Sequence, residues 1–253
     1  MKSSETCRLY EKPALREAGG GLIRPGGLEL TMRAVALSGL CPGSLLLDIG
    51  CGTGAALRCL AETGKFRVVG IDLSSDLLAE GRRKNPELSL SHASGAALPF
   101  ADGSMDAVLA ECSLSAMEDV EAALDGCARI LKLGGLLLVH DVYARAPHGK
   151  TRLQGLPVKT CLTGAVSKDE WMARLESRGF TVTLWEDHSS ALKEFAARLI
   201  FSCGSLEMFW NCSGSASEVE RGRQTYHTVS SAKPGYFLAL AKKAHSVRKD
   251  GER

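Results

Sequence analysis

The stretch "LLLDIGCGTGAAL" (residues 45–57) decides the fold class of this chain. An apolar run ends at Ile49, and glycines then occupy positions 50, 52 and 54. A residue without Cβ permits a sharp turn and lets backbone amides approach a ligand closely, so the stretch predicts a buried strand, a glycine-rich turn and a helix entrance. Taken alone, the turn also fits the G-x-G-x-x-G/A pattern of dinucleotide-binding proteins, and its ligand stays open at this point.

The residues around the turn favour a ligand without phosphates. Asp48 lies two residues ahead of the first glycine, where a carboxylate would repel a diphosphate and attract an ammonium group. A helical segment at residues 26–40 precedes the first strand, and Gly54 keeps the following helix entrance open. A dinucleotide is therefore disfavoured, although Asp72 stands where dinucleotide-binding proteins carry a ribose-binding acid.

Composition favours one main domain with a small-molecule partner. The chain has 253 residues, 45% of them hydrophobic, and a formal net charge of +2. No long basic block indicates a nucleic-acid partner, and no apolar run reaches the ~20 residues that a membrane span requires. The nine cysteines show no repeated C-x-x-C pattern, which predicts reduced thiols and no metal site. We expect a soluble, cytoplasmic protein of undetermined oligomeric state.

Strands and helices alternate through the first part of the chain. Five strands are expected at residues 44–49, 67–72, 88–92, 105–110 and 135–141. Helical spacing lies between them, with Ser74 or Ser75 at the start of one helix and Gly134 at the end of the last. This alternation predicts a parallel sheet with crossover helices.

The C-terminal part departs from this alternation. A helix is expected between an N-cap at Ser167, with Glu170 in the capping-box position, and a stop at Gly179. Strands are expected at residues 180–187 and 235–243. If these two strands pair as a hairpin, the long segment between them is far beyond an ordinary hairpin loop and predicts a helical cap inserted before the last strand.

Four motifs in order resemble those of the class I S-adenosylmethionine-dependent methyltransferases, within a similarity that runs over residues 28–243. They are "LDIGCGTG" (47–54), "VVGIDLS" (68–74), "ALPFADGSMDAVLAE" (97–111) and "ARILKLGGLLLVHD" (128–141). The resemblance implies a Rossmann-like α/β fold: a seven-stranded mixed sheet with its last strand antiparallel and helices on both faces. It also implies S-adenosyl-L-methionine as the cofactor.

The same resemblance implies which residues hold the cofactor. Asp48 and the turn backbone would bind the methionine part, Asp72 the ribose hydroxyls, and Leu73 would flank the adenine. Glu111 would lie beneath the cofactor, and Ser94 stands where many relatives carry an acid that binds the adenine amino group. The full expected set is Asp48, Gly50, Cys51, Gly52, Gly54, Asp72, Leu73, Ser94, Gly95 and Glu111.

A protic acceptor would also need a base. For methyl transfer from a sulfonium, the protein mainly has to align donor and acceptor and to exclude water. An acceptor that is an alcohol or phenol must also lose a proton. Ligands of open α/β sheets bind at the carboxyl ends of strands, which points to Asp141 and His188 as catalytic candidates. His188 is expected to be exposed and titratable near neutrality, whereas His140 is expected to pack in a strand.

Soft chemistry is the alternative for the acceptor. The segment "TCLTGAVSKDEW" (160–171) resembles the C-x-x-G-A segment after strand five of arsenite methyltransferases, where the cysteine is a metalloid ligand. That resemblance makes Cys161 a third catalytic candidate, and Cys203 and Cys212 could supply further thiolates.

We expect four parts in the chain. Residues 1–40, with a rigid turn at Arg24 and Pro25, would close the cofactor site, and residues 244–253 would form a frayed tail. The core would comprise residues 41–187 and 235–243, and the cap residues 188–234. The expected function is methyl transfer to a small-molecule acceptor, with an NAD(P)-dependent oxidoreductase or a cofactor-binding protein without turnover as alternatives.

Overall fold

The computed structural model describes residues 24–210 and 216–244. The predictions for residues 1–23, for Cys212 and for most of the C-terminal tail therefore lie outside the described residues. Within the two described ranges, no helix is both long and apolar enough to cross a membrane.

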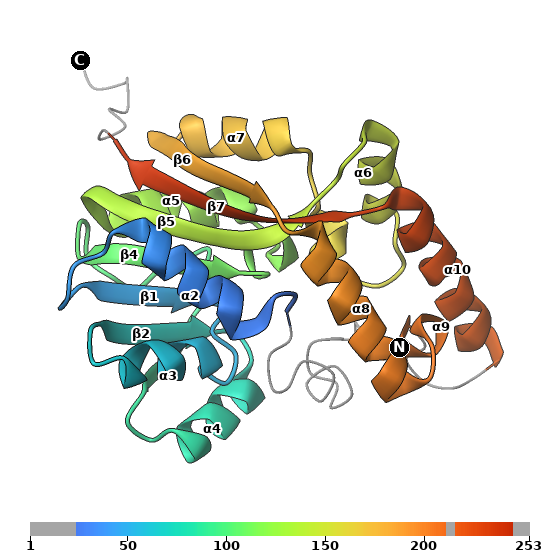
Figure 1. Ribbon diagram of the computed structural model, residues 1–253, viewed down its shortest axis with the longest axis horizontal. Coiled ribbons are helices and arrows are strands. Elements are labelled where there is room, and N and C mark those ends of the chain that lie inside the picture. Colours follow the sequence, from blue (N-terminus) through green and yellow to red (C-terminus); the bar gives the residue numbers. More distant parts are fainter. Residues whose placement is uncertain (1–23, 211–215, 245–253) are drawn as a thin grey trace, which may run out of the picture.

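Seven strands form one mixed sheet in the order β3-β2-β1-β4-β5-β7-β6 (Figure 1). The first five strands are parallel, and β7 runs antiparallel between β5 and β6. This confirms the predicted mixed sheet with a reversed last strand. The strand order changes direction between β1 and β4, the switch point at which open α/β sheets bind their ligands. The strands are β1 (Leu45–Ile49), β2 (Arg67–Asp72), β3 (Ser89–His92), β4 (Met105–Glu111), β5 (Leu131–Tyr143), β6 (Phe180–Asp187) and β7 (Gly235–Lys243).

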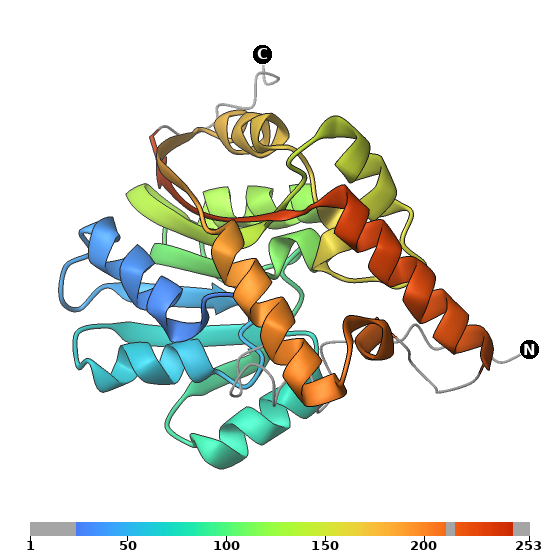
Figure 2. The same cartoon turned by 45° about the vertical axis from the view of Figure 1, so that its right-hand side comes forward.

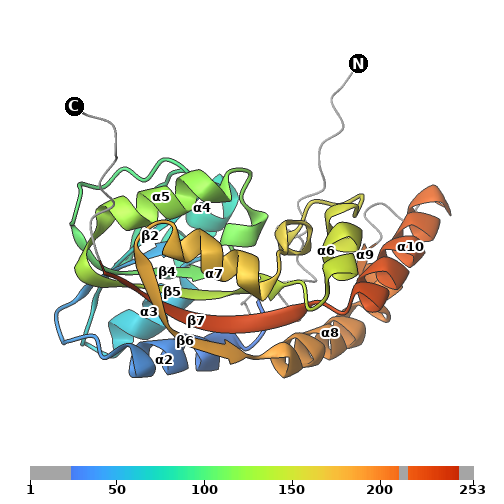
Figure 3. The ribbon, with the colours of Figure 1, turned by 90° about the horizontal axis from the view of Figure 1, so that it is seen from above.

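Helices cover both faces of the sheet, and each face has its own hydrophobic cluster (Figure 3). Alternate residues of the central strands point to opposite faces, so Leu138 joins one cluster and Leu137 the other. One face carries α2 (Gly27–Ser38), α3 (Ala55–Glu62) and α8 (Ser189–Cys203), and the other carries α5 (Val120–Ile130) and α7 (Lys168–Glu176).

Two predicted helix starts are confirmed by their caps. The hydroxyl of Ser74 accepts a hydrogen bond from the backbone N–H of Leu77 and so begins α4 (Ser75–Lys84). Ser167 and Glu170 form the predicted capping box of α7, each side chain accepting the other residue's backbone N–H. These caps satisfy amide groups that a helix start leaves without intrahelical partners.

The prediction that the helix before β5 ends at Gly134 is wrong. Helix α5 ends at Ile130, and β5 begins at the next residue, because the backbone of the fully buried Leu131 already pairs with Met105 of β4. Gly134, the expected helix stop, lies inside β5 with φ 76°. It belongs to the irregular stretch where the β4–β5 register shifts, and a left-handed residue suits such a bulge.

The inserted segment between β6 and β7 is helical and lies beyond the carboxyl ends of the parallel strands (Figures 1 and 2). It consists of α8, α9 (Leu206–Trp210) and α10 (Ala216–Ala232). Helix α6 (Pro147–Gln154), which follows β5, lies on the same side of the molecule. The cap thus stands at the sheet edge where the glycine-rich turn opens, and its closing role stays a prediction.

Candidate active site

The glycine-rich turn joins β1 to α3 in a left-handed backbone. The φ angles are 78° at Gly50, 55° at Gly52 and 78° at Gly54, a region that residues with a side chain rarely adopt. A Cβ on Gly50 would lie 2.7 Å from the Cβ of Ser113, whereas one on Gly52 would meet nothing nearer than 3.9 Å. Gly50 is therefore required by packing against the loop after β4, while the backbone at Gly52 faces space that a ligand can enter.

Asp72, at the end of β2, fastens this turn. Its Oδ2 accepts a hydrogen bond from the backbone N–H of Gly52 at 2.8 Å, and its Oδ1 accepts one from Ser74 at 2.7 Å. Each carboxylate oxygen keeps a second lone pair, so the side chain can still accept a bond from a ligand hydroxyl. The neighbouring Leu73 is 57% exposed and offers an uncovered apolar surface to a flat ring.

Cys51 contributes backbone to the turn, not its thiol. Its side chain is buried against Leu57 and the leucines of α4 and the β3 region. Burial, followed by the charges of Asp48 and Asp72, raises the pKa of this thiol far above its usual range. The backbone N–H of Cys51 donates to the carbonyl of Ile71 at 3.0 Å, which ties the turn to β2.

Ser94 and Gly95 lie in the segment that follows β3, at the same edge of the sheet. The hydroxyl of Ser94 accepts a hydrogen bond from the backbone N–H of Ala96 at 3.2 Å. A Cβ on Gly95 would lie 2.6 Å from Cε of Met117, so this glycine lets the segment pack closely against the loop after β4. Their contact with an adenine ring stays a prediction.

Two buried carboxylates, Glu111 and Asp48, lie near this turn, and a buried guanidinium pairs with Glu111. Nη2 of Arg24 lies 2.7 Å from Oε2 of Glu111, and Thr31 of α2 donates its hydroxyl to Oε1 of Glu111 at 2.8 Å. Burial raises the pKa of Glu111, but Arg24 and His140 outweigh burial and hold it below its usual range. For Asp48, burial and then the charge of Glu111 raise the pKa well above its usual range.

This arrangement suits a cationic ligand. Arg24 and Glu111 neutralise each other, which leaves Asp48 as a buried carboxylate in excess of the nearby positive charge. Leaving a buried carboxylate unpaired is unfavourable, and a ligand ammonium or sulfonium group would relieve that cost. The residues present therefore fit a positively charged ligand beside the open backbone of Gly52.

Both side-chain oxygens of the predicted base Asp141 already accept hydrogen bonds from the protein. Asp141 is completely buried and accepts hydrogen bonds from the backbone N–H groups of Ser115 at 3.0 Å and Val142 at 2.7 Å, and a short bond from the Ser115 hydroxyl. Burial raises the pKa of Asp141 to about 6 against these hydrogen bonds. We therefore infer that Asp141 positions the 3₁₀ turn η2 (Leu114–Ala116) in place of the predicted role as a base.

His188 lies apart from the predicted cofactor residues. Its Nε2 is 2.9 Å from Oε2 of Glu186, which also binds the guanidinium of Arg33 on α2. Strand β6 is the fourth strand beyond β1, which at about 4.8 Å a strand places His188 roughly 19 Å from the turn. A role for His188 as base stays a prediction.

The predicted soft ligand Cys161 meets a cysteine that the sequence did not single out. Cys161 begins the 3₁₀ turn η3 (Cys161–Gly164), and its thiol forms a hydrogen bond with that of Cys112, directly after β4. That bond, followed by burial, raises the pKa of the Cys112 thiol well above its usual range. Cys203, the predicted partner, lies at the end of α8 instead. The signal for Cys112 was its place right after Glu111 at a strand end.

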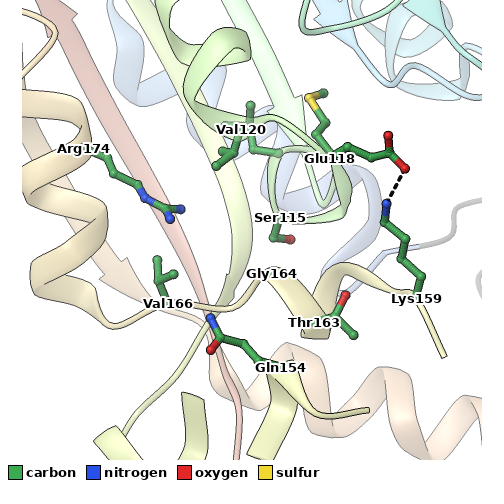
Figure 4. A pocket seen from close by; sticks show the side chains of 11 residues that line it. Ser115, Glu118, Val120, Gln154, Lys159, Thr163, Gly164, Val166 and Arg174 are labelled. Carbon is green, nitrogen blue, oxygen red and sulfur yellow. Dashed lines mark hydrogen bonds and ion pairs between the residues drawn. The ribbon is translucent and has the colours of Figure 1, made fainter. Parts of the chain in front are cut away.

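A cavity of about 410 Å³ lies between the loop after β4, η3 and α7 (Figure 4). Arg174 and Gln154 point into it from different elements (Figure 4). Both of its cations are paired: Nζ of Lys159 lies 2.7 Å from Oε1 of Glu118, and Nε of Arg174 lies 2.9 Å from Oε1 of Glu121. The cavity thus has a mixed polar and apolar lining, and each of its two cations is paired with a glutamate.

Comparison with known proteins decides the family. Residues 47–139 match a family model described as a methyltransferase domain. A demethylmenaquinone methyltransferase of Corynebacterium kroppenstedtii is 31% identical over 218 residues, which cover 83% of this chain and 89% of that protein. The chain belongs to the class I S-adenosylmethionine-dependent methyltransferases. Membership identifies S-adenosyl-L-methionine as the cofactor of this site.

Two further comparisons show how far the similarity of this class I methyltransferase to other proteins extends. A demethylmenaquinone methyltransferase of Beutenbergia cavernae is 34% identical over 139 residues, and this match spans 54% of the chain and only 58% of that relative. The crystal structure titled [4+2]-cyclase SpnF has a TM-score of 0.75 at 24% identity and covers 91% of both chains. That likeness shows the fold alone, so the reaction must be argued from the site.

Proposed function

We propose that this class I methyltransferase transfers a methyl group from S-adenosyl-L-methionine to a small-molecule acceptor held between the carboxyl edge of the sheet and the cap. One observation carries the proposal: at the switch point between β1 and β4, the buried Asp48 has no ion-pair partner among the described residues and stands on the strand that leads into the open backbone of Gly52. A cationic, phosphate-free ligand complements that environment.

The chain's own residues would hold and shield this cofactor. When bound, the cofactor supplies a methyl group that its sulfonium already activates. Asp48 would bind the ammonium group, Asp72 would accept bonds from the ribose hydroxyls, and Leu73 would cover one face of the adenine. The buried ion pair of Glu111 and Arg24 would lie beneath the cofactor and exclude water, which would strengthen each electrostatic contact within the site.

A second candidate, a soft acceptor such as trivalent arsenic, is favoured by the Cys112–Cys161 thiol pair. Both thiols are reduced and hydrogen-bonded to each other, so they can bind one thiophilic atom together. Each bond from arsenous acid to a thiol would release one water, with the thiol proton leaving on the departing hydroxyl. Soft thiolate ligands favour such acceptors. In this candidate Cys112 replaces the predicted partner Cys203.

Cofactor binding is tested first. Purified protein is titrated calorimetrically with S-adenosylhomocysteine and with a reduced dinucleotide, and thermal unfolding is followed with each. A ligand at 100 times its dissociation constant should stabilise the fold by ~2.7 kcal/mol. We expect stabilisation by S-adenosylhomocysteine alone; stabilisation by the dinucleotide alone would support the oxidoreductase alternative.

The acceptor is tested with radiolabelled methyl donor and three probes: 1,4-dihydroxynaphthalene, 2-mercaptoethanol and arsenite. Methylation of a probe supports turnover, and binding of cofactor without methylation of any probe would support the reading of a protein without turnover. If arsenite is the acceptor, Cys112→Ser and Cys161→Ser should abolish its methylation. The matched control Cys41→Ser, an exposed cysteine between α2 and β1, should retain full activity.

A further inference from the structure

Three polar side chains follow one another across the sheet on the face that α2 and α8 cover. Glu111 of β4 pairs in register with His140 of β5. On the next strand, Tyr236 of β7 pairs with Val142 and is therefore the diagonal neighbour of His140, at about 7–8 Å between Cα atoms. His140 and Tyr236 are both completely buried. Together the three side chains form a polar row at the carboxyl edge of the sheet.

Four buried atoms of this row make no hydrogen bond within the described residues: Oε2 of Glu111, both ring nitrogens of His140 and the hydroxyl of Tyr236. Oε2 of Glu111 and Nδ1 of His140 nonetheless lie at ion-pair distance from Arg24 and Glu111, respectively. For Nε2 of His140 and the hydroxyl of Tyr236, residues 24–210 and 216–244 offer no partner of either kind. Buried polar side chains in native proteins are almost always hydrogen-bonded, and exceptions are commonly completed by a ligand or an ordered water. Two such atoms on neighbouring strands indicate a place for a polar ligand atom.

The other ring nitrogen of His140 defines its protonation. Nδ1 lies 3.0 Å from Oε1 of Glu111, whose charge is supported by Nη2 of Arg24 at 2.7 Å. The contact does not meet hydrogen-bond geometry, but a lone pair on Nδ1 would face the negative Oε1 at this distance, so we assign the ring proton to Nδ1. Nε2 then bears the lone pair, and the imidazole is oriented as a base with a carboxylate behind it.

The row also borders the cofactor site. Glu111 is the residue whose charge acts on Asp48, the carboxylate beside the glycine-rich turn. Tyr236 packs in the same hydrophobic cluster as Cys112 and Cys161, at the start of the strand that follows the cap. An acceptor placed between cofactor and cap would therefore meet this row.

We propose that Nε2 of His140 and the hydroxyl of Tyr236 form the polar end of the acceptor subsite, for an acceptor whose reactive oxygen or nitrogen carries a proton. This rests on the proposed function. The acceptor's proton passes to Nε2, and the electron pair of its broken bond stays on the acceptor atom. As that atom takes the methyl group, the pair of the broken carbon–sulfur bond stays on sulfur. The imidazolium is balanced by Glu111 until it returns the proton to solvent.

The test uses the full chain with ¹⁵N-labelled histidine, saturated with S-adenosylhomocysteine. Long-range proton–nitrogen spectra should show His140 with a protonated Nδ1 and an unprotonated Nε2 at neutral pH. Phenol, the simplest protic probe, should shift the Nε2 resonance as it donates a hydrogen bond. Tyr236→Phe should weaken phenol binding by up to about tenfold, the effect of one hydrogen bond.

Assignment and controls keep this test decisive. The His140 signals should vanish in His140→Asn and persist in His148→Asn, a change at an exposed histidine of α6. The chain has six histidines, so if His140→Asn fails to fold, single variants of the other five assign the same signals by elimination.

The outcomes separate the two proposals. A protonated Nε2, or an Nε2 resonance that phenol leaves unmoved because a structural water holds the place, would overturn the subsite while S-adenosylhomocysteine still binds. Failure of S-adenosylhomocysteine to bind in the parallel calorimetric titration would overturn the proposed function, and the subsite with it.

Discussion

Three buried carboxyl groups at one edge of the sheet have pKa values that are shifted by different neighbours. Glu111 has a guanidinium and an imidazole beside it, and its pKa falls below the usual range. Asp141 has only hydrogen-bond donors, and burial raises its pKa to about 6. Asp48 has a like charge nearby, and its pKa rises well above the usual range. The carboxylate with the least compensation is the one expected to meet a cationic ligand.

Asp48→Asn should weaken binding of S-adenosylhomocysteine by about 10- to 100-fold, because a hydrogen bond to a charged group contributes about 1.5–3 kcal/mol. Isothermal titration calorimetry measures the change. The matched control is Asp106→Asn, in which the same substitution falls at the opposite end of a neighbouring strand, where Asp106 pairs with Lys132. Equal losses in both variants would contradict the assigned role of Asp48.

Asp141 should make stability depend on pH. Its pKa is 3.8 in its ordinary state and about 6 when folded, so its stabilising contribution is complete below about 4 and is lost as pH rises through 6. This contribution is on the order of 3 kcal/mol. Urea denaturation at pH 4.5 and 7.5 should show a smaller difference between the two pH values in Asp141→Asn than in the unaltered protein.

Sequence reasoning at this scale could find residues that act through local pattern. The glycines and Asp48 follow from a turn that needs left-handed backbone and close ligand approach. The network of Arg24, Glu111 and His140 could not be found, because it joins an N-terminal turn and two strands that are distant in sequence. His140 was expected only to pack, since neighbouring residues reveal burial but not which side chain lies across the sheet.

Among the elements, η2 and η3 are held together by one glycine. A Cβ on Gly164 would lie 1.9 Å from the carbonyl oxygen of Ser115, so the two turns can touch only because position 164 has no side chain. This contact keeps Cys161 beside Cys112. The glycine of the C-x-x-G-A segment thus has a packing role that is independent of any acceptor.

Gly164→Ala should lower the free energy of unfolding by about 1–3 kcal/mol, the usual cost of overpacking. Gly155→Ala is the matched control, because its Cβ would meet nothing nearer than 3.5 Å and its φ is −83°. That change should stay within about 0.5 kcal/mol of the unaltered protein. Chemical denaturation measures the free energy of unfolding of both variants. Equal values for Gly164→Ala and Gly155→Ala would refute the packing role of Gly164.

The sequence predicted helix boundaries correctly where a side-chain cap defines them. It predicted a boundary wrongly where pairing between strands defines it. Ser74 and Ser167 carry the signal of a helix start in their own chemistry. Gly134 looked like a helix stop, yet α5 ends earlier because Leu131 pairs with a strand that lies about 25 residues before it. Such pairing leaves no local pattern in the sequence.

Over the whole molecule, burial is greatest in the middle of the sheet. Strands β4, β5 and β7 are covered on both faces, whereas β3 at one edge has a single buried residue among its four. Fold class, strand count and the inserted cap were all predictable, because alternation of strands and helices reflects this global layering. The family resemblance implied an antiparallel last strand, but the position of β7 between β5 and β6 was not predicted.

Hydrogen exchange should mirror this layering. After correction for intrinsic rates, backbone amides of β4, β5 and β7 should exchange slowest and those of β3 much faster, since protection follows burial and local contact density. Mass spectrometry of peptic fragments resolves the strands. Slower exchange in β3 than in β5 would show that the sheet opens from its middle, against this expectation.

The place of β7 has a consequence for synthesis on the ribosome. The strand that separates β5 from β6 is the last strand of the sheet to leave the exit tunnel. Until then, one edge of β5 is unpaired and β6 has no partner strand in the sheet. Such edges invite pairing with other polypeptides. Late emergence of a single segment thus leaves the sheet incomplete until β7 (Gly235–Lys243) has been synthesised.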